Sequence, residues 1–350
     1  MSCKRLLYAP NVHQGGGKSL LLPILEELKG MKDVIFVLDT RMVLPEQGLA
    51  GEVYRVKPTV FSRLWFEWHL KSLISSEMIL LCMGNLPPLF AHQGKQRVFV
   101  QNRYLIDKVA LSSLSMSVRI RLVVERWWLR SRSKYAESFF VQTATMKSLL
   151  DKQLGRCASV LPFAVLPIKE DSVYKEERHK VYDFVYVASG EPHKQHRALI
   201  AGWVELAKQN LFPSLCLTLD AQRFPELCAW IQKMKESHDL YIDIKGELTH
   251  QDIYKLYNVS KAMIYPSTFE SFGVPLLEAA ALSMPIVTAD IDYVYDVIKP
   301  TATFDVGSPE SIANAVKNMT ARPANIISNI STVEDFLEKT FDISSLRKIL

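Results

Sequence analysis

The chain has 350 residues, of which 48% are hydrophobic and 23% charged; these values exclude disordered and fibrous proteins and leave room for two folded domains. The net charge of +5 is unevenly divided, because residues 1–165 carry +11 and residues 166–350 carry −6. Two halves of opposite charge indicate two domains with different electrostatic tasks. An anionic membrane lipid, a nucleic acid or a phosphorylated small molecule would each suit the basic half.

No segment of the sequence reaches the roughly 18 uninterrupted apolar residues of a membrane-spanning helix. The first ten residues, MSCKRLLYAP, resemble a first strand rather than a secretory signal. The five cysteines form no CxxC pair and have no histidine at zinc spacing, so they indicate neither a disulfide framework nor a metal site. We therefore expect a reduced, cytoplasmic protein.

The N-terminal half alternates short apolar runs with helical stretches. The first run is followed by three glycines, Gly15, Gly16 and Gly17, which we expect to form a turn before a helix. A later helix is expected to begin near Thr143. The predicted strands are 5–8, 34–38, 78–83, 97–101 and 139–142, and the first predicted helix is 19–28.

The C-terminal half repeats this design. Thr249 is a suitable cap for one helix, and Pro275 stands at the first position of another. The predicted strands are 184–188, 215–219, 240–244, 262–265 and 285–288; the predicted helices are 196–209, 221–236, 250–258 and 275–282. Such alternation predicts parallel βαβ units and an α/β fold. Prolines and a charged run between Leu161 and Tyr182 indicate the boundary between domains of residues 1–165 and 166–330.

The clearest functional signal is a pair of carboxylates, Glu270 and Glu278, on either side of a predicted strand–turn–helix junction. In open α/β sheets ligands bind at the carboxyl ends of the strands, where this junction lies. The helix N-terminus suits a diphosphate, and Gly273 allows a ligand to approach the backbone closely. Both carboxylates can accept hydrogen bonds from vicinal hydroxyls. A sugar and a ribose joined by a diphosphate match this arrangement.

The surrounding residues resemble the E-x7-E motif of glycosyltransferase family 4, P-S-x-x-E-x-F-G-x-P-x-x-E-A, which runs here from Pro266 to Ala279 with all eight motif residues present. The family has the GT-B fold, two Rossmann-like domains that face each other across a cleft. The resemblance is good over residues 180–310 and mainly topological over residues 1–160. It also implies that residues 331–350 return to the first domain.

The resemblance implies a donor site in the second domain. Glu270 and Lys194 would be the catalytic residues, with Glu270 on the donor sugar and Lys194 on the diphosphate. The other residues implied to bind the donor are Gly16, Gly17, Ser189, Gly246, Leu248, Ser271, Phe272, Gly273, Val274 and Glu278. His13 and Asn102 are candidate acceptor or sugar contacts.

Two positions depart from the family pattern. An arginine that binds phosphate in the family is missing, since Gly190 and Glu191 stand near its place, and Arg197 is a candidate replacement. Asn102 stands where the family often has a histidine. These departures favour an alternative, a non-catalytic nucleotide-sugar-binding partner of another transferase. A GT-B epimerase or phosphorylase is a further rival, although no pyridoxal-lysine signature is present.

The resemblance implies a retaining hexosyl transfer from a nucleotide sugar, a UDP-sugar ahead of a GDP-sugar, without a metal or other cofactor. We expect a saccharide acceptor, lipid-linked, in bacterial surface-polysaccharide assembly of the O-antigen or capsule type. The segment from Arg119 to Lys134 holds six basic residues and two tryptophans, a composition typical of membrane-interface helices and also of ordinary solvated helices. It is the expected contact with the inner face of the cytoplasmic membrane. No nucleic-acid partner is expected.

Overall fold

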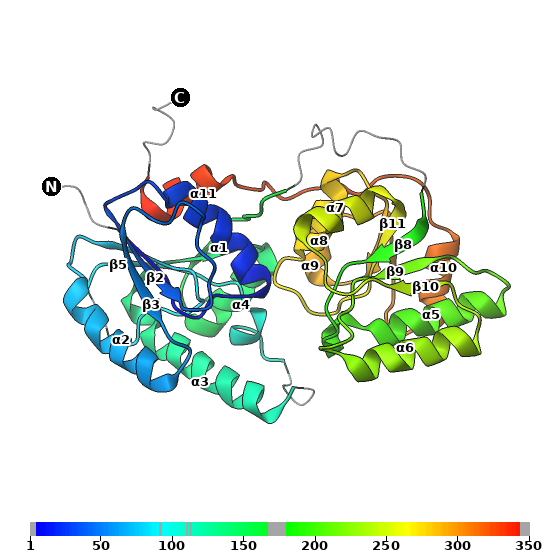
Figure 1. Cartoon of the computed structure of the whole chain (residues 1–350), viewed down its shortest axis with the longest axis horizontal. Helices are drawn as coiled ribbons and strands as arrows, with labels where there is room; N and C mark the ends of the chain where they lie inside the picture. Colours follow the sequence, from blue (N-terminus) through cyan, green and yellow to red (C-terminus); the bar gives the residue numbers. More distant parts are fainter. Residues whose placement is uncertain (1–4, 91–92, 110, 112–113, 167–179, 344–350) are drawn as a thin grey trace. The chain divides into compact units, whose positions relative to one another are not determined.

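The computed structural model describes residues 5–90, 93–109, 111, 114–166 and 180–343. The chain forms two compact units (Figure 1). The first contains the residues up to Val165 together with those from Asn329 onward, and the second runs from Leu166 to Ser328. Most of the charged run expected at the boundary, 175–180, lies outside the described residues.

The first unit is built on a sheet of seven parallel strands in the order β3-β2-β1-β4-β5-β6-β7. The order reverses between β1 and β4, which is the point where open α/β sheets bind ligands. The central strands are buried on both faces, which explains their nearly continuous apolar sequences. The strands are β1 (Arg5–Ala9), β2 (Val34–Asp39), β3 (Glu52–Val56), β4 (Ile79–Cys82), β5 (Lys95–Phe99), β6 (Ala136–Val141) and β7 (Ala158–Val160).

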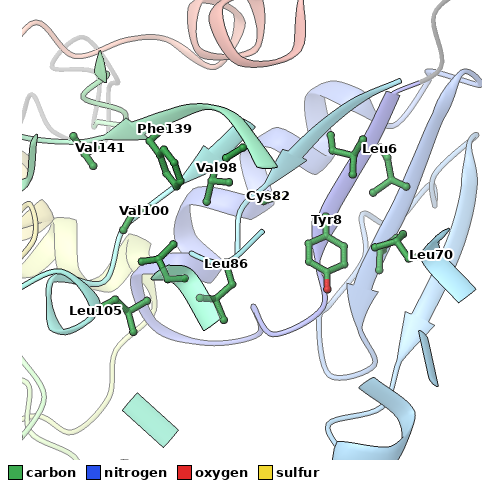
Figure 2. Close-up of a cluster of buried hydrophobic side chains, with 14 of the residues drawn as sticks. Leu6, Tyr8, Leu70, Cys82, Leu86, Val98, Val100, Leu105, Phe139 and Val141 are labelled. Atoms are coloured by element: carbon green, nitrogen blue, oxygen red, sulfur yellow. The ribbon is translucent and has the colours of Figure 1, made fainter. Parts of the chain in front are cut away.

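Helices cover both faces of this sheet and create two separate cores. On one face the core residues come from α2 (Val60–Leu73), α3 (Met116–Arg132) and α4 (Ala144–Leu154). Figure 2 shows this cluster, with Tyr8 of β1 and Leu70 of α2 among its members. On the other face the core includes α1 (Gly15–Leu28) and α11 (Val333–Phe341). Short 3-10 helices, η1 (Arg103–Leu105) and η2 (Ser133–Tyr135), complete the unit.

The C-terminal helix α11 completes the core of the first unit although it follows the second unit in sequence. Phe336 stacks on Phe163 with ring centroids 4.5 Å apart and meets Phe99 edge-on at 5.0 Å. Arg5 donates from Nε to the carbonyl oxygen of Phe341 at 2.9 Å, and Arg97 pairs with Asp342 at 2.7 Å. The C-terminal segment is thus held on the first unit by aromatic contacts in the core and by polar contacts at the surface.

The second unit holds a sheet of six parallel strands in the order β10-β9-β8-β11-β12-β14. Its order reverses between β8 and β11, as in the first unit between β1 and β4. The strands are β8 (Tyr182–Tyr186), β9 (Leu215–Leu217), β10 (Ile242–Ile244), β11 (Ser260–Tyr265), β12 (Ile286–Ala289) and β14 (Ala302–Phe304). A small antiparallel pair, β13 (Ile298–Lys299) and β15 (Asn325–Ile326), lies outside this sheet.

Helices also cover the two faces of the second sheet (Figure 1). One face carries α5 (His196–Lys208), α6 (Pro225–Ser237) and α10 (Pro309–Lys317), and the other carries α7 (His250–Asn258), α8 (Val274–Ala281) and α9 (Asp292–Val297). Thr249 caps α7 as predicted, because its side-chain oxygen accepts a hydrogen bond from the amide of Asp252.

The predicted strands and helices of both halves are confirmed, with ends shifted by a few residues. One prediction is wrong: the three glycines do not form a turn before the first helix. Helix α1 already begins at Gly15, so Gly16 and Gly17 belong to its first turn. Glycine's low helix propensity conceals this start, which is held by the leucines that follow. Strand β3 and helix α2 have no counterpart among the predicted elements.

Candidate functional site

The candidate site of the second unit is built on the loops that follow two neighbouring strands. Strand β8 leads into the short helix η4 (Pro192–Lys194), and β11 leads into the loop that carries Glu270. Because β8 and β11 pair side by side at the switch point, both loops emerge at the same edge of the sheet. The fold therefore places Lys194 and Glu270 side by side, although they are 76 residues apart in the sequence.

Three groups converge on one oxygen of Glu270. Lys194 Nζ lies 2.5 Å from Oε1, the hydroxyl of Ser267 donates to it at 2.5 Å, and the hydroxyl of Tyr265 donates at 3.1 Å. The side chains of Lys194 and Glu270 are only 14% and 15% exposed, so their attraction is poorly screened by water. The carboxylate is thus fixed in place before any ligand binds.

Buried tyrosines hold the two loops from below. Tyr186, at the end of β8, donates to the carbonyl oxygen of Lys194 at 2.7 Å. Tyr293, at the start of α9, donates to the carbonyl oxygen of Ser267 at 2.7 Å. The loops also bind each other, since the amide of Thr268 donates to the carbonyl oxygen of His193 at 2.9 Å. A fully buried hydroxyl must find a partner, so these bonds make the loop positions part of the core.

Gly273 caps α8 in the left-handed conformation, with φ of 74°. A side chain there would be strained, and its Cβ would lie 3.3 Å from the ring of Tyr293. At the start of α8, Pro275 has no N–H and the amide of Leu276 donates to the carbonyl oxygen of Gly273 at 2.9 Å, so the amide of Val274 is the donor of the first turn that can serve an anion. Ser271 and Val274 are partly exposed beside this end, whereas the side chain of Phe272 is buried and leaves only its backbone for a ligand.

Glu278 lies on α8 and is 4% exposed. Tyr257 donates to its Oε2 at 3.2 Å, and Nδ1 of His250 lies 3.8 Å from its Oε1. Burial raises the pKa of Glu278 to about 7, and the hydrogen bond from Tyr257 opposes that rise. A buried carboxyl with so few partners can accept hydrogen bonds from a ligand, such as vicinal hydroxyls.

Of the other predicted donor residues in the second unit, Gly246 and Leu248 lie in a further loop, and Ser189 lies in the loop after β8 that also carries Lys194. Gly246 and Leu248 form the turn between β10 and α7; Gly246 has φ of 77° and open space where a Cβ would stand. Ser189 follows β8 and donates its hydroxyl to Glu191. Arg223, in the loop after β9, pairs with Glu191 at 3.3 Å. Arg197 does not reach this loop, because its guanidinium lies over the ring of Trp230 at 4.4 Å.

The first unit places its candidate residues at the carboxyl edge of its own sheet. Gly16 and Gly17 lie in the first turn of α1, and His13 precedes them with its Nδ1 4.0 Å from Oδ2 of the buried Asp39. Asn102 follows β5 and caps η1, since its side-chain oxygen accepts from the amide of Tyr104 at 3.1 Å. Asn102 is therefore occupied in a local turn.

Residues 168–329 match the sequence model of a family described as glycosyl transferases group 1. The match lies almost entirely within the second unit, which is therefore similar to the glycosyl transferases group 1. Curated proteins similar to this chain include the O-antigen chain mannosyltransferase RfbU of Salmonella typhimurium, 23% identical over 211 residues. They also include the serotype-specific mannosyltransferase WbdA of Escherichia coli, 29% identical over 155 residues. These alignments cover 55% and 39% of this chain, and 59% and 17% of the relatives.

Solved structures show the fold over most of the chain. HepE of Anabaena, crystallised with UDP and glucose, has a TM-score of 0.64 at 14% identity, with 89% of each chain covered. The lipopolysaccharide outer core galactosyltransferase WaaB has a TM-score of 0.63 at 16% identity, with 89% of this chain and 90% of WaaB covered. The fold is therefore GT-B, as the resemblance implied.

Several residues of this candidate site are absent from the sequence-based prediction. Tyr265 and Tyr257 look like ordinary core residues of a strand and a helix, and only the hydroxyl hints at a buried polar partner. Ser267 belongs to the motif, but its contact with Glu270 depends on the loop geometry. Arg223 has no motif of its own and reaches Glu191 only because β9 lies beside β8.

Proposed function

We propose that the protein transfers a hexosyl group from a nucleotide-sugar donor to a saccharide acceptor and retains the anomeric configuration. The observation that supports this most directly is the fixed pair of Lys194 and Glu270 at the switch point, with Glu278 on the adjacent helix. A cation, a helix N-terminus and two carboxylates together match the charge pattern of a sugar diphosphate. The HepE structure, which holds UDP, supports such a ligand for this fold.

The mechanism follows from the placement of these groups. The bond between the anomeric carbon and the phosphate oxygen breaks, and the acceptor oxygen bonds to that carbon on the same face. Lys194 and the positive N-terminal end of α8, with the amide of Val274, stabilise the negative charge on the departing diphosphate, which is the main electrostatic task. Glu270 binds hydroxyls of the donor sugar, and Glu278 binds the ribose. The departing phosphate oxygen takes the acceptor proton, so the mechanism needs no separate base, and the proposal assigns the neutralisation of the diphosphate to Lys194 instead of a metal.

The acceptor in this proposal is a lipid-linked saccharide of bacterial surface-polysaccharide assembly. Support comes from the names of RfbU and WbdA, which are O-antigen and serotype-specific mannosyltransferases, and of WaaB, which acts on lipopolysaccharide. These names favour mannose as the sugar, whereas the HepE complex supports a uridine nucleotide. We place a UDP-sugar ahead of a GDP-sugar, and the donor test must include hexoses on both bases.

A screen against UDP-, GDP- and dTDP-sugars tests the proposal. Thermal shift reports binding, and mass spectrometry reports the released nucleotide diphosphate. We expect one donor family to stabilise the protein and to be hydrolysed slowly, with and without EDTA. Glu270→Ala should reduce turnover by about 100–1000-fold and leave nucleotide binding nearly intact. Unchanged turnover in that variant would contradict the role of Glu270.

A non-catalytic donor-binding partner is the second candidate, because Glu191 places a negative charge in the loop where the family has a phosphate-binding arginine. That candidate predicts stabilisation by a donor without released diphosphate, even when lipid-linked acceptors are added. Release of the diphosphate by the wild-type protein but not by Glu270→Ala would exclude it.

A further inference from the structure

Helices α2 and α3 carry an unusual concentration of exposed apolar side chains. Nineteen large hydrophobic residues are exposed in the described part of the chain, and ten of them lie on these two helices. On α2 they are Val60, Phe61, Leu64, Trp65 and Trp68; on α3 they are Met116, Ile120, Val123, Val124 and Trp127. The spacings of three, four and seven residues place each set along one side of its helix.

The opposite sides of both helices are already used by the core. Phe66 and Leu70 of α2 and Leu122 and Leu129 of α3 are buried in the same cluster below the sheet. Each helix is therefore apolar on two sides, which an ordinary surface helix is not. Such an exposed apolar surface indicates a contact with a partner or a membrane.

The two helices lie together on one face of the first unit (Figure 1). Charged side chains between them confirm that they are close: Arg63 of α2 acts on the pKa of Glu125 of α3, and Arg132 of α3 acts on that of Glu67 of α2. Trp128 points inward and donates to the carbonyl oxygen of Pro87 at 2.8 Å, whereas its neighbour Trp127 is 61% exposed. The adjacent tryptophans thus divide the inner side of α3 from the outer.

The charge of this face is positive throughout. Each helix contains a single acidic residue; Glu67 is 2% exposed and Glu125 is half-buried. Basic side chains surround the apolar residues, and those that are exposed are Lys57, Lys71, Arg121, Arg130 and Lys134. An anionic lipid surface complements this combination of apolar centre and basic rim.

We propose that α2 and α3 together form a membrane-binding face that docks on an anionic lipid bilayer. Trp65, Trp68 and Trp127 enter the interface between headgroups and acyl chains, where amphipathic rings are favoured. The basic side chains extend from the rim to the lipid phosphates. The helices lie in the plane of the membrane because their inner sides remain in the core. This binding does not depend on the proposed transferase activity.

Co-sedimentation of the full chain with lipid vesicles tests the proposal. We expect the protein to bind vesicles that contain phosphatidylglycerol, to bind pure phosphatidylcholine vesicles less, and to lose binding as salt is raised. The triple variant Trp65→Ala/Trp68→Ala/Trp127→Ala should reduce the partition constant at least about tenfold. A matched control is Phe212→Ala/Tyr241→Ala, which removes exposed aromatic side chains from the second unit and should bind as the wild type does.

Charge and apolar contributions can be separated. Arg121→Glu/Arg130→Glu should remove the preference for anionic vesicles while the thermal stability of the chain is kept. Hydrogen exchange of the wild-type protein with and without vesicles needs no variant, and protection should be confined to residues 60–73 and 116–132. Donor binding measured on the same variants should be unchanged, which separates failure of this proposal from failure of the proposed function.

Two results would overturn the proposal. One is absence of binding by the wild-type chain to anionic vesicles at low salt. The other is a triple variant that binds as tightly as the wild type. A self-associating protein that becomes monomeric in the triple variant, without any vesicle binding, would assign the face to a second copy of the chain instead.

Discussion

Nζ of Lys194 lies 2.5 Å from Oε1 of Glu270, in a site where both side chains are about one-seventh exposed. Each of the two groups therefore positions the other. We expect Lys194→Ala and Glu270→Gln each to lower kcat/KM for transfer by about 100–1000-fold. The fold-loss in kcat/KM of the double variant should be smaller than the product of the two single fold-losses. The difference corresponds to a coupling free energy of about 1–2 kcal/mol. The surface pair of exposed Lys208 and half-buried Glu205, 2.9 Å apart on α5, is the matched control and should show no coupling in the transfer rate.

Arg223 is expected to contribute to donor binding through Glu191, which it pairs with at 3.3 Å. Without the arginine, the carboxylate of Glu191 would stand unneutralised beside the loop proposed to bind the diphosphate. Arg223→Ala should weaken the donor about three- to tenfold, as expected for a partly exposed charge. Arg197→Ala is the control, since Arg197 stacks on Trp230 instead. Equal effects of the two variants in calorimetry would refute the assignment.

Donor binding should depend on the ionisation of Glu278, whose pKa burial raises to about 7. The ionised carboxyl offers only acceptors to the ribose hydroxyls, so affinity should rise as the pH increases through 7. A sugar nucleotide is the right probe, because its diphosphate stays ionised over this range. Glu278→Gln should flatten the pH profile and weaken binding by about 10–100-fold. An affinity that falls from pH 6 to pH 8 in the wild type would be inconsistent with this role.

Glu67 should make the first unit less stable as the pH rises. It accepts hydrogen bonds from Tyr8 and from the amide of Leu89, yet burial raises its pKa from 4.5 to about 7. Between these values the folded state keeps a proton that the unfolded state has lost, so stability is full below about pH 4.5 and declines until about pH 7. The free energy of unfolding should fall by at most about 3 kcal/mol over this pH range.

Urea unfolding at pH 5 and pH 8 measures this effect. Glu67→Gln mimics the protonated carboxyl, and its stability should change less between the two pH values than that of the wild type. Glu77→Gln, on the surface beyond α2, is the control. Its free energy of unfolding should change between pH 5 and pH 8 as much as that of the wild type. Parallel pH profiles for the wild type and Glu67→Gln would show that Glu67 does not titrate in this range.

The predicted elements agree best where apolar runs are bounded by turn residues and caps, as at Thr249 and β11. Helix α2 escaped prediction because its sequence, VFSRLWFEWHLKSL, is apolar on two sides and shows no single hydrophobic stripe. The same property that hides the helix is the basis of its proposed membrane role. Local periodicity cannot reveal why an apolar residue is present, since core and interface use the same side chains.

The individual residues of the site could be predicted from the sequence, but the contacts between them could not. Glu270, Glu278 and Lys194 stand out as motif residues, but the bond between Lys194 and Glu270 depends on β8 and β11 being neighbours. The bonds from Tyr265 to Glu270 and from Tyr186 to the carbonyl oxygen of Lys194 are local in sequence, but they depend on how each loop folds back on the strand before it. Phe272 shows the reverse case, because the motif marks it while the structure buries its side chain. A motif thus identifies a position without saying whether its side chain or its backbone is used.

The contact of Phe336 with Phe163 and Phe99 has a consequence for biosynthesis. The ribosome makes the seven-stranded sheet first, but the aromatic side chain that closes one of its cores emerges only after the whole second unit. The second unit, whose residues are continuous, needs no residue made after Ser328 to complete its own core. The first unit is therefore synthesised first but completes its core last. A stop codon a few residues before α11 would leave one face of its sheet without the side chains of that helix.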